Sequence, residues 1–256
     1  MSGEKTGAAE PSVLGALGSW LREIAIVVVG ALVASTLLRL FVAQMFVIPS
    51  SSMENTLLIG DRVAVQKVVG YQRGDIVVFR DSLGWLGDAP PQEDLGQQVL
   101  VFIGLAPDES SNHLIKRVIG ISGDHVACCD AKGRLTVNGV ALNEQDYLYV
   151  DHLTGKQAEP SRMAFDVVVP AGTVFVMGDH RNQSEDSRCH IVEDVAGEPR
   201  GYKAFVPVTD IVGTAVAVVF PFNRIHGLSR PTTFADIPAP APAPAEPVIK
   251  GNPTGC

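Results

Sequence analysis

The 256-residue sequence predicts a mainly β protein, in which an N-terminal transmembrane helix precedes a β-rich, barrel-like domain. Three observations predict this class. An apolar segment near the N-terminus is long enough to cross a bilayer. Short runs rich in valine and isoleucine then recur between turn residues. Beyond them, a Pro/Ala-rich segment cannot pack a core of its own.

The apolar segment carries no charged residue from Ile24 to Leu38, and after Arg39 it resumes as far as Ile48. A bilayer needs about 20 helical residues, and an arginine near one end can extend to the interface. We expect an uncleaved anchor over about residues 23–43, in a membrane unit of residues 23–46. A buried helix of a soluble domain would also be apolar on all faces. A cleaved signal peptide is the other alternative, but no convincing small-x-small cut site precedes Pro49.

Eight strand-like runs follow the anchor, and their Val/Ile content and turn-separated spacing indicate a curled or barrel-like sheet rather than an open one. Asn138-Gly139 is a hairpin-type turn signal. An apolar patch at 99–103 is either an interfacial contact or a covered core segment. The predicted strands are 62–68, 75–79, 114–119, 125–128, 134–137, 167–169, 173–177 and 211–220.

The last segment, residues 223–256, contains P-A-P-A-P-A-P-A-E-P from Pro238, and we expect a flexible, extended tail. Four cysteines leave the disulfide connectivity open. Cys128 or Cys129 could pair with a distant cysteine, and a bond between these neighbours is the less favoured alternative. Cys256 is expected to stay free or to form intermolecular links.

Composition limits the partners. The net charge of −8 argues against nucleic acid, which selects basic surfaces. Six scattered histidines show no paired metal spacing, and no P-loop or dinucleotide fingerprint occurs. We therefore expect no cofactor and no metal.

Three stretches carry the chemistry. The first is I-P-S-S-S-M-E-N-T-L-L-I-G-D at 48–61, the second is L-I-K-R at 114–117, and the third is M-G-D-H-R-N-Q-S-E-D-S-R at 177–188. Together they resemble type I signal peptidases, the membrane-anchored Ser/Lys proteases that cut signal peptides from exported proteins. The adjacent Cys128-Cys129 pair and G-D-H-R resemble the versions of high-GC Gram-positive bacteria.

This resemblance implies a domain plan and a location. Residues 1–22 would be a cytoplasmic tail, and residues 47–222 an extracytoplasmic catalytic domain with residues 126–169 as an inserted β subdomain. The charges of the N-terminal tail give little positive-inside bias, so the orientation rests on the resemblance. The implied activity is serine endopeptidase cleavage of exported preproteins after small residues, at the cytoplasmic membrane. The implied partners are signal peptides and the lipid bilayer.

The resemblance also assigns the site. Ser52 would be the nucleophile and Lys116 its base, because a serine hydroxyl reacts only when its proton is removed. A lysine can serve as a base only when it is uncharged, and apolar surroundings lower its pKa. A solvated strand lysine is the ordinary alternative. Ser50 and the Ser52 N–H would stabilise the oxyanion. Ser184 would orient Lys116, with Asp186 and Arg188 as an ion pair behind the site and Asp179 in the same loop.

By the same resemblance, six residues would form the substrate pockets for small side chains before the cut. They are Phe46, Ile48, Pro49, Met53, Leu57 and Ile115. The sequence departs from the family at Asn55, where proline is common, and at His180 and Gln183, where asparagine is frequent.

Three alternatives stay open. A Ser/His/Asp triad could use Ser52, His180 and Asp186, although no G-x-S-x-G elbow occurs. A catalytically silent, membrane-anchored β-domain that binds secretion partners would belong to a different functional class. A soluble Ser/Lys self-cleaving repressor fold is disfavoured by the long anchor.

Overall fold

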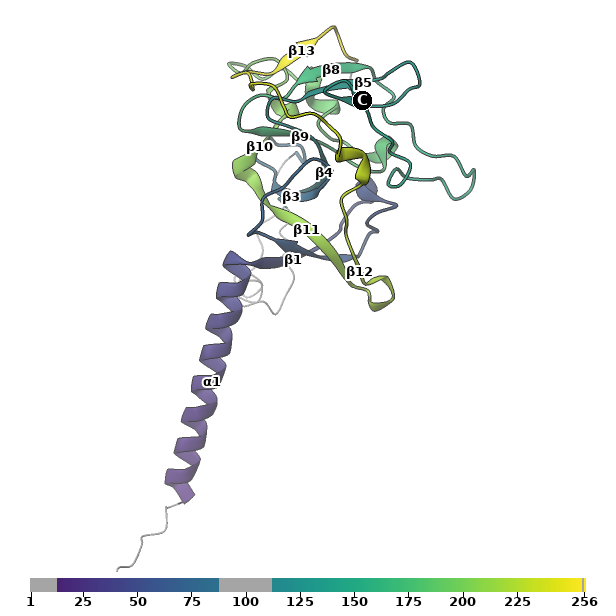
Figure 1. Cartoon of the computed structure of the whole chain (residues 1–256). Helices are drawn as coiled ribbons and strands as arrows, with labels where there is room; N and C mark the ends of the chain where they lie inside the picture. The colour runs from purple at the N-terminus through teal and green to yellow at the C-terminus, as the bar shows by residue number, and fades with distance from the viewer. Residues whose placement is uncertain (1–12, 88–111, 255) are drawn as a thin grey trace, which may run out of the picture.

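One long helix and two antiparallel sheets make up most of the described part of the protein (Figure 1). The computed structural model describes residues 13–87, 112–254 and 256. The apolar patch at 99–103 lies outside the described residues. All eight predicted strands are present, with small shifts of their bounds.

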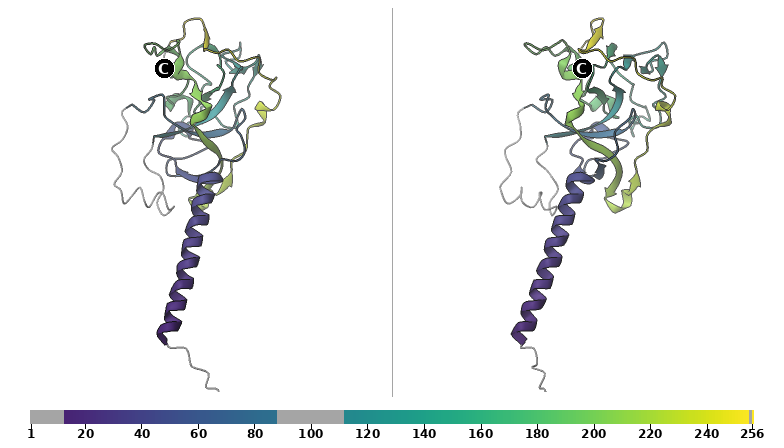
Figure 2. Two further views of the ribbon diagram at one scale, coloured as in Figure 1. Left: turned by 90° about the vertical axis from the view of Figure 1, so that its left-hand side faces the viewer. Right: turned by 60° about the vertical axis from the view of Figure 1, so that its left-hand side comes forward.

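Helix α1, Val13–Phe41, projects away from both sheets in each view of Figure 2. Its window Trp20–Leu37 has a mean hydropathy of 1.8, and none of it is buried by the rest of the structure. Val27, for example, is 70% exposed. Length and composition therefore allow α1 to cross a membrane, and the helix is not a core helix of the described domain.

The helix ends earlier than the membrane unit of residues 23–46 that the sequence suggested. Strand β1, Ala43–Val47, already follows it and pairs with β2, with Phe46 opposite Val63. Phe46 is buried, whereas its neighbour Met45 is 49% exposed. This alternation is that of a strand, and it could not be recognised within a continuous apolar run.

The larger sheet has the order β1-β2-β11-β3-β4-β9-β10, with β12 paired to β11. All its pairs are antiparallel, and β11 carries irregularities against both β2 and β3. Within the described ranges, β1 and β10 stay at the two ends of this order, so the pairing forms no closed barrel. Its strands are β2 (Arg62–Gln66), β3 (Ile76–Arg80), β4 (His113–Ile121), β9 (Thr173–Met177), β10 (Val206–Pro207), β11 (Ile211–Phe220) and β12 (His226–Gly227), besides β1.

The smaller sheet has the order β13-β8-β5-β6-β7. Asn138 and Gly139, with φ of 51° and 81°, form the turn between β6 and β7, as the sequence predicted. Four of its strands come from the segment expected to be an insertion, and the fifth is C-terminal. The strands are β5 (His125–Cys128), β6 (Thr136–Val137), β7 (Val140–Ala141), β8 (Phe165–Val168) and β13 (Val248–Lys250).

The core of the larger sheet lies directly beneath the first motif. Met53 and Leu57 are fully buried there and pack in one cluster with Phe46, Ile48 and Ile115. These side chains gain burial free energy of roughly 25 cal/mol per Å² of apolar surface. The core thereby fixes the backbone on both sides of Ser52.

The C-terminal segment differs from the expected flexible tail. It is extended, but Ile237 is buried, and Pro238 O accepts a hydrogen bond from Arg73 (3.1 Å). Ala171 N donates to Pro244 O at 2.8 Å, and β13 then pairs with β8. The prolines of this run lack an N–H donor, but their carbonyl groups still accept hydrogen bonds, so a neighbouring surface can hold the segment.

The cysteine pairing also differs from expectation. Cys189 is bonded to Cys256, across 67 residues, so Cys256 is not free. Cys128 is bonded to Cys129, the alternative that the sequence disfavoured. Local sequence could not indicate the first bond, because only the path of the C-terminal segment brings Cys256 to Cys189.

Candidate active site

Ser52 lies in a single 3-10 turn, Ser51–Met53, which residues 48–50 connect to β1. The turn is held at both ends: Gly60 N donates to Ile48 O at 2.9 Å, and His180 N donates to Ser52 O at 3.0 Å. Buried Met53 anchors it from below. The Ser52 residue is 5% exposed, so its hydroxyl sits in a largely desolvated position.

Lys116 reaches Ser52 from the middle of β4. Its Nζ lies 2.7 Å from Ser52 Oγ, and the residue is 2% exposed. Burial lowers the pKa of Lys116 from 10.5 to about 8, although the Asp186 and Asp179 carboxylates act to raise it. The structure thus brings together the two residues that the sequence paired across 64 positions. A lysine with this pKa is partly uncharged near neutral pH, as a general base requires.

Ser50 lies beside this pair, with its Oγ 3.3 Å from Ser52 Oγ. Ser184 differs from the prediction that it orients Lys116. Its Oγ donates to Asp186 Oδ2 at 2.7 Å, and no hydrogen bond joins it to Lys116 in the described part of the chain. The hydroxyl has one proton, and the charged carboxylate is a stronger acceptor for it than a neutral amine would be.

Gly178 shows how tightly the third motif packs against the first. A Cβ at this position would collide with Ser184 Oγ and with Ser52 O. Its N–H donates to Asp186 Oδ2 at 3.0 Å. Any larger residue would therefore push the Ser184 loop away from the Ser52 turn.

Two buried ion pairs stand behind the pair of Ser52 and Lys116. Arg188 donates to both oxygens of Asp186, at 2.8 and 2.9 Å, as the sequence predicted. Burial alone would raise the pKa of Asp186, but Arg188 and the other donors lower it below its usual value. Arg117 likewise donates to both oxygens of Asp179, at 2.8 and 2.6 Å. The partner of Asp179 was not predicted. The position of Arg117 within an apolar strand could have indicated a buried ion pair.

A third buried pair was missed entirely. Arg181 Nη2 donates to Glu144 Oε1 at 2.5 Å, and Tyr147 Oη donates to the same oxygen at 2.6 Å. The Arg117 guanidinium lies 4.4 Å from the centre of the Tyr147 ring. These contacts fasten the inserted segment to the third motif. Glu144 is 37 residues from Arg181, so local sequence carried no signal for the pair.

The six predicted substrate-binding residues separate into two sets. Phe46, Ile48, Pro49 and Ile115 line a hollow of about 30 Å³ between β1 and the start of β4. A cavity that holds one water molecule needs roughly 10–15 Å³ of such volume, so the hollow is small. Met53 and Leu57 are 0% exposed in the core below it. The hollow as it stands admits only a very small side chain.

His180 does not complete a triad. Its ring stacks on Tyr149 with centroids 3.7 Å apart, and its Nδ1 lies 3.2 Å from Glu54 Oε2. No hydrogen bond from its ring to Ser52 or Asp186 is present among the described residues. Asn55, the other departure from the family, has φ of +87°. Proline is fixed near −65°, so it could not adopt this turn, whereas asparagine tolerates it.

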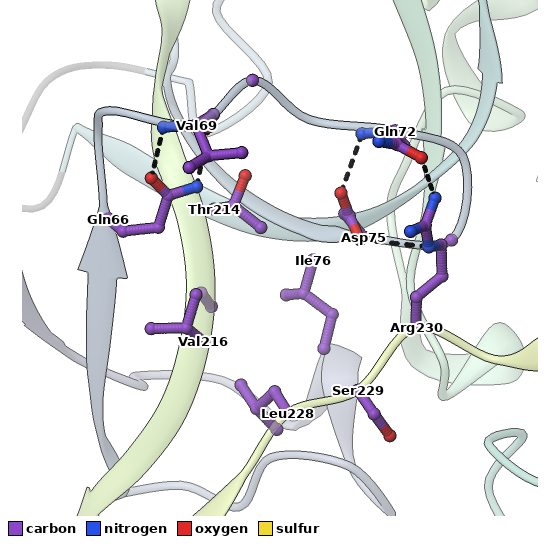
Figure 3. A pocket seen from close by; sticks show the side chains of 13 residues that line it. Gln66, Val69, Gln72, Asp75, Ile76, Thr214, Val216, Leu228, Ser229 and Arg230 are labelled. Carbon is purple, nitrogen blue, oxygen red and sulfur yellow. Dashed lines mark hydrogen bonds and ion pairs between the residues drawn. The ribbon is translucent and has the colours of Figure 1, made fainter.

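A second cavity, of about 290 Å³, lies away from these side chains, between β2, β11 and residues 228–230 (Figure 3). Arg230 bonds Gln72 within its wall, and Gln66 bonds Val69. Neither Ser52 nor Lys116 lines it. In the described residues, no group of three or more His, Cys, Asp or Glu side chains could hold a metal ion.

Comparison with known proteins identifies the family. The family model "Signal peptidase, peptidase S26" matches residues 20–220. This chain belongs to that family. Signal peptidase I of Mycobacterium tuberculosis is 37% identical over 235 residues, which cover 80% of this chain and 74% of the relative. Signal peptidase I of Bacillus licheniformis is 31% identical, covering 82% and 92%. A solved signal peptidase I from Enterococcus faecalis aligns over 58% of this chain and 98% of its own, with 24% identity and a TM-score of 0.29.

The mycobacterial relatives agree with the predicted likeness to high-GC Gram-positive signal peptidases. The family also establishes the activity class, since signal peptidase I is a serine peptidase. The family is therefore neither one of silent binding domains nor one of self-cleaving repressors.

Proposed function

We propose that Ser52 and Lys116 form the catalytic dyad of this signal peptidase I. The observation that carries the proposal is the 2.7 Å approach of Lys116 Nζ to Ser52 Oγ in a buried position. Uncharged Lys116 takes the proton of Ser52, and Oγ attacks the carbonyl carbon of the scissile peptide. Lys116 then gives this proton to the leaving amine. Water hydrolyses the acyl-enzyme, with Lys116 again as base.

The oxyanion of each tetrahedral intermediate needs donors that are already in place. We assign this role to the Ser52 N–H and the Ser50 hydroxyl, which is 3.3 Å from Ser52 Oγ. The Asp186–Arg188 and Asp179–Arg117 pairs position the loop beneath the site. Ser184 acts on Lys116 through Asp186, whose charge faces the amine.

Substrate choice follows from the hollow lined by Phe46, Ile48, Pro49 and Ile115. A large side chain overlaps its walls, whereas each added methylene in an apolar site contributes only about 0.8 kcal/mol. We expect cleavage after small residues, with a second small residue two positions earlier, as in Ala-x-Ala sites. Met53 and Leu57 form the floor beneath these positions.

We further propose that α1 spans the cytoplasmic membrane once and that the catalytic domain lies on the extracytoplasmic side. The 29-residue helix ends one residue before β1, so it would hold the Ser52 turn close to the bilayer surface. A version lacking residues 1–42 should cut soluble peptides normally but process membrane-inserted preprotein more slowly. Equal rates on inserted preprotein would contradict the role of α1.

The dyad is tested by incubating the full-length protein with a preprotein and measuring the mass of the product. Ser52→Ala, Lys116→Ala and Lys116→Arg should each abolish processing, because a guanidinium stays charged. The double variant should be no worse than either single one, since the two residues act as a unit. Lys132→Ala, on an exposed turn, is the matched control and should cut normally.

Two outcomes would reject the dyad. Substantial cleavage by Lys116→Arg would show that no neutral amine is needed. Total loss of activity in folded His180→Ala, with Lys116→Ala still active, would favour a histidine-based mechanism instead.

A further inference from the structure

A polar cavity of about 570 Å³ lies beside the Ser52 turn, in a position that the dyad and the small apolar hollow do not use. Two of its lining residues are bonded to the turn itself. Ser51 Oγ donates to Gln183 Oε1 at 3.2 Å, and His180 N donates to Ser52 O at 3.0 Å. The cavity therefore adjoins the turn that carries the proposed nucleophile, although Ser52 itself does not line it.

The two spaces near Ser52 differ in chemistry. Four of the residues that line the apolar hollow, 46–49, precede Ser52 on β1 and the segment after it. The polar cavity is lined by His180 and Gln183 of the third motif. Lys156, Glu159 and Arg162 also line it. Charged walls disfavour an apolar signal peptide, because the charged side chains would lose their hydrogen bonds to water and gain none from the peptide. They suit a polar polypeptide, which can form hydrogen bonds in return.

We propose that this cavity binds the first residues of the mature polypeptide, on the leaving side of the cut. The inference rests on the proposed function, in which the apolar hollow takes the small residues before the cut. The chain after the cut must then continue from Ser52 in another direction, and the polar cavity is lined by Gln183 and His180, which are bonded to Ser51 and Ser52. The segment bound here is extended and polar.

The walls of the cavity are preorganised. Tyr149 stacks on His180, its N–H donates to Asp179 O at 3.2 Å, and its carbonyl accepts from Ala158 N at 2.7 Å. Asp151 Oδ1 accepts from the N–H groups of Leu153 and Thr154, at 2.8 and 2.9 Å. A surface that is already ordered binds a peptide with less loss of entropy than a mobile loop does.

The test uses the full-length protein in detergent and two peptides with the same residues before the cut. The long peptide continues with several polar residues after the cut, and the short one with a single amidated residue. The long peptide should have a kcat/KM at least about tenfold higher, since binding of remote substrate parts lowers the barrier. A third peptide, with leucine and phenylalanine after the cut, should resemble the short one.

Filling the cavity supplies the matched variants. Thr154 lines it, so Thr154→Trp should reduce the long-to-short ratio of kcat/KM to about one. Leu153 is 97% exposed and does not line it, so Leu153→Trp should leave the ratio unchanged. Equal wild-type rates on both peptides, or a loss in Thr154→Trp that is the same for both, would overturn the inference while leaving the dyad intact. Cleavage by Ser52→Ala would instead reject the proposed function.

Discussion

At the scale of single residues, burial rather than residue type lowers the pKa of Lys116. Lys116 is an ordinary strand lysine in sequence, but it is 2% exposed, within the buried middle of β4. Desolvation disfavours its charged form more than the nearby Asp186 and Asp179 favour it. The same side chain on an exposed strand would remain protonated and could not accept the Ser52 proton.

The pH dependence follows from this shift. Because only neutral Lys116 can take a proton, kcat/KM should rise with pH and reach half of its plateau near the pKa of about 8. Below that pH, activity should fall about tenfold per unit. A rate profile on a soluble peptide, from about pH 6 to about pH 10, checks this. A half-point near pH 6.5, typical of histidine, would point to a different base.

At the scale of elements, β4 serves the site from both of its faces. Lys116 meets the Ser52 turn, and the next residue, Arg117, holds Asp179 in the third motif. Alternation along a strand sends neighbouring side chains to opposite sides, so one strand aligns two motifs that are distant in sequence. The position of the loop at 177–188 therefore depends on a buried charge pair.

Removing one partner of this pair should be costly. Arg117→Leu leaves the 0% exposed Asp179 without its guanidinium, which should lower the free energy of unfolding by about 3–5 kcal/mol. Activity should fall with it, because the loop behind Lys116 loses its support. Arg134→Ala breaks an ion pair in which the Arg134 side chain is 44% exposed and the Asp130 side chain 22% exposed. This substitution should change stability little. Thermal unfolding of both variants in detergent makes the comparison; similar melting temperatures would contradict it.

At the scale of the whole molecule, the C-terminal segment links the two sheets to the site. It leaves β12 on the larger sheet and adds β13 to the smaller one (Figure 1). Beyond β13, Cys256 forms a disulfide with Cys189. Cys189 directly follows Arg188, the partner of Asp186. The last residue of the chain is thus tied to the element that follows the third motif.

Loss of this tie should destabilise the folded protein. A disulfide that spans 67 residues restricts the unfolded chain by about 4 kcal/mol, so Cys256→Ser should lower the melting temperature. It should also expose the segment around residue 250 to proteolysis, which mass measurement of the fragments detects. A reducing agent should lower the melting temperature of the wild type but leave that of Cys256→Ser nearly unchanged. Cys128→Ser controls for reduction of the other disulfide. An unaltered melting temperature in Cys256→Ser would show that the bond does not hold the segment.

The sequence alone determined the class of the fold, all eight of the strands it named, and the likeness to signal peptidases. These are local properties: apolar length for α1, alternation for the strand at 62–68, and three motifs in a fixed order. Ser52, Lys116 and the Asp186–Arg188 pair could be named because the motifs carry them, and the structure brings all four together.

Only the tertiary structure decided the rest. The end of α1 before β1 depends on pairing with β2, and the bond of Ser184 to Asp186 depends on the close packing at Gly178. The Arg181–Glu144 pair joins residues far apart in sequence. The composition of the C-terminal segment predicts a mobile tail. In the structure, hydrogen bonds to its carbonyl groups, the pairing of β13 with β8 and a disulfide fix it in place. Such contacts join residues that are distant in sequence and meet only after folding, so no local pattern along the chain predicts them.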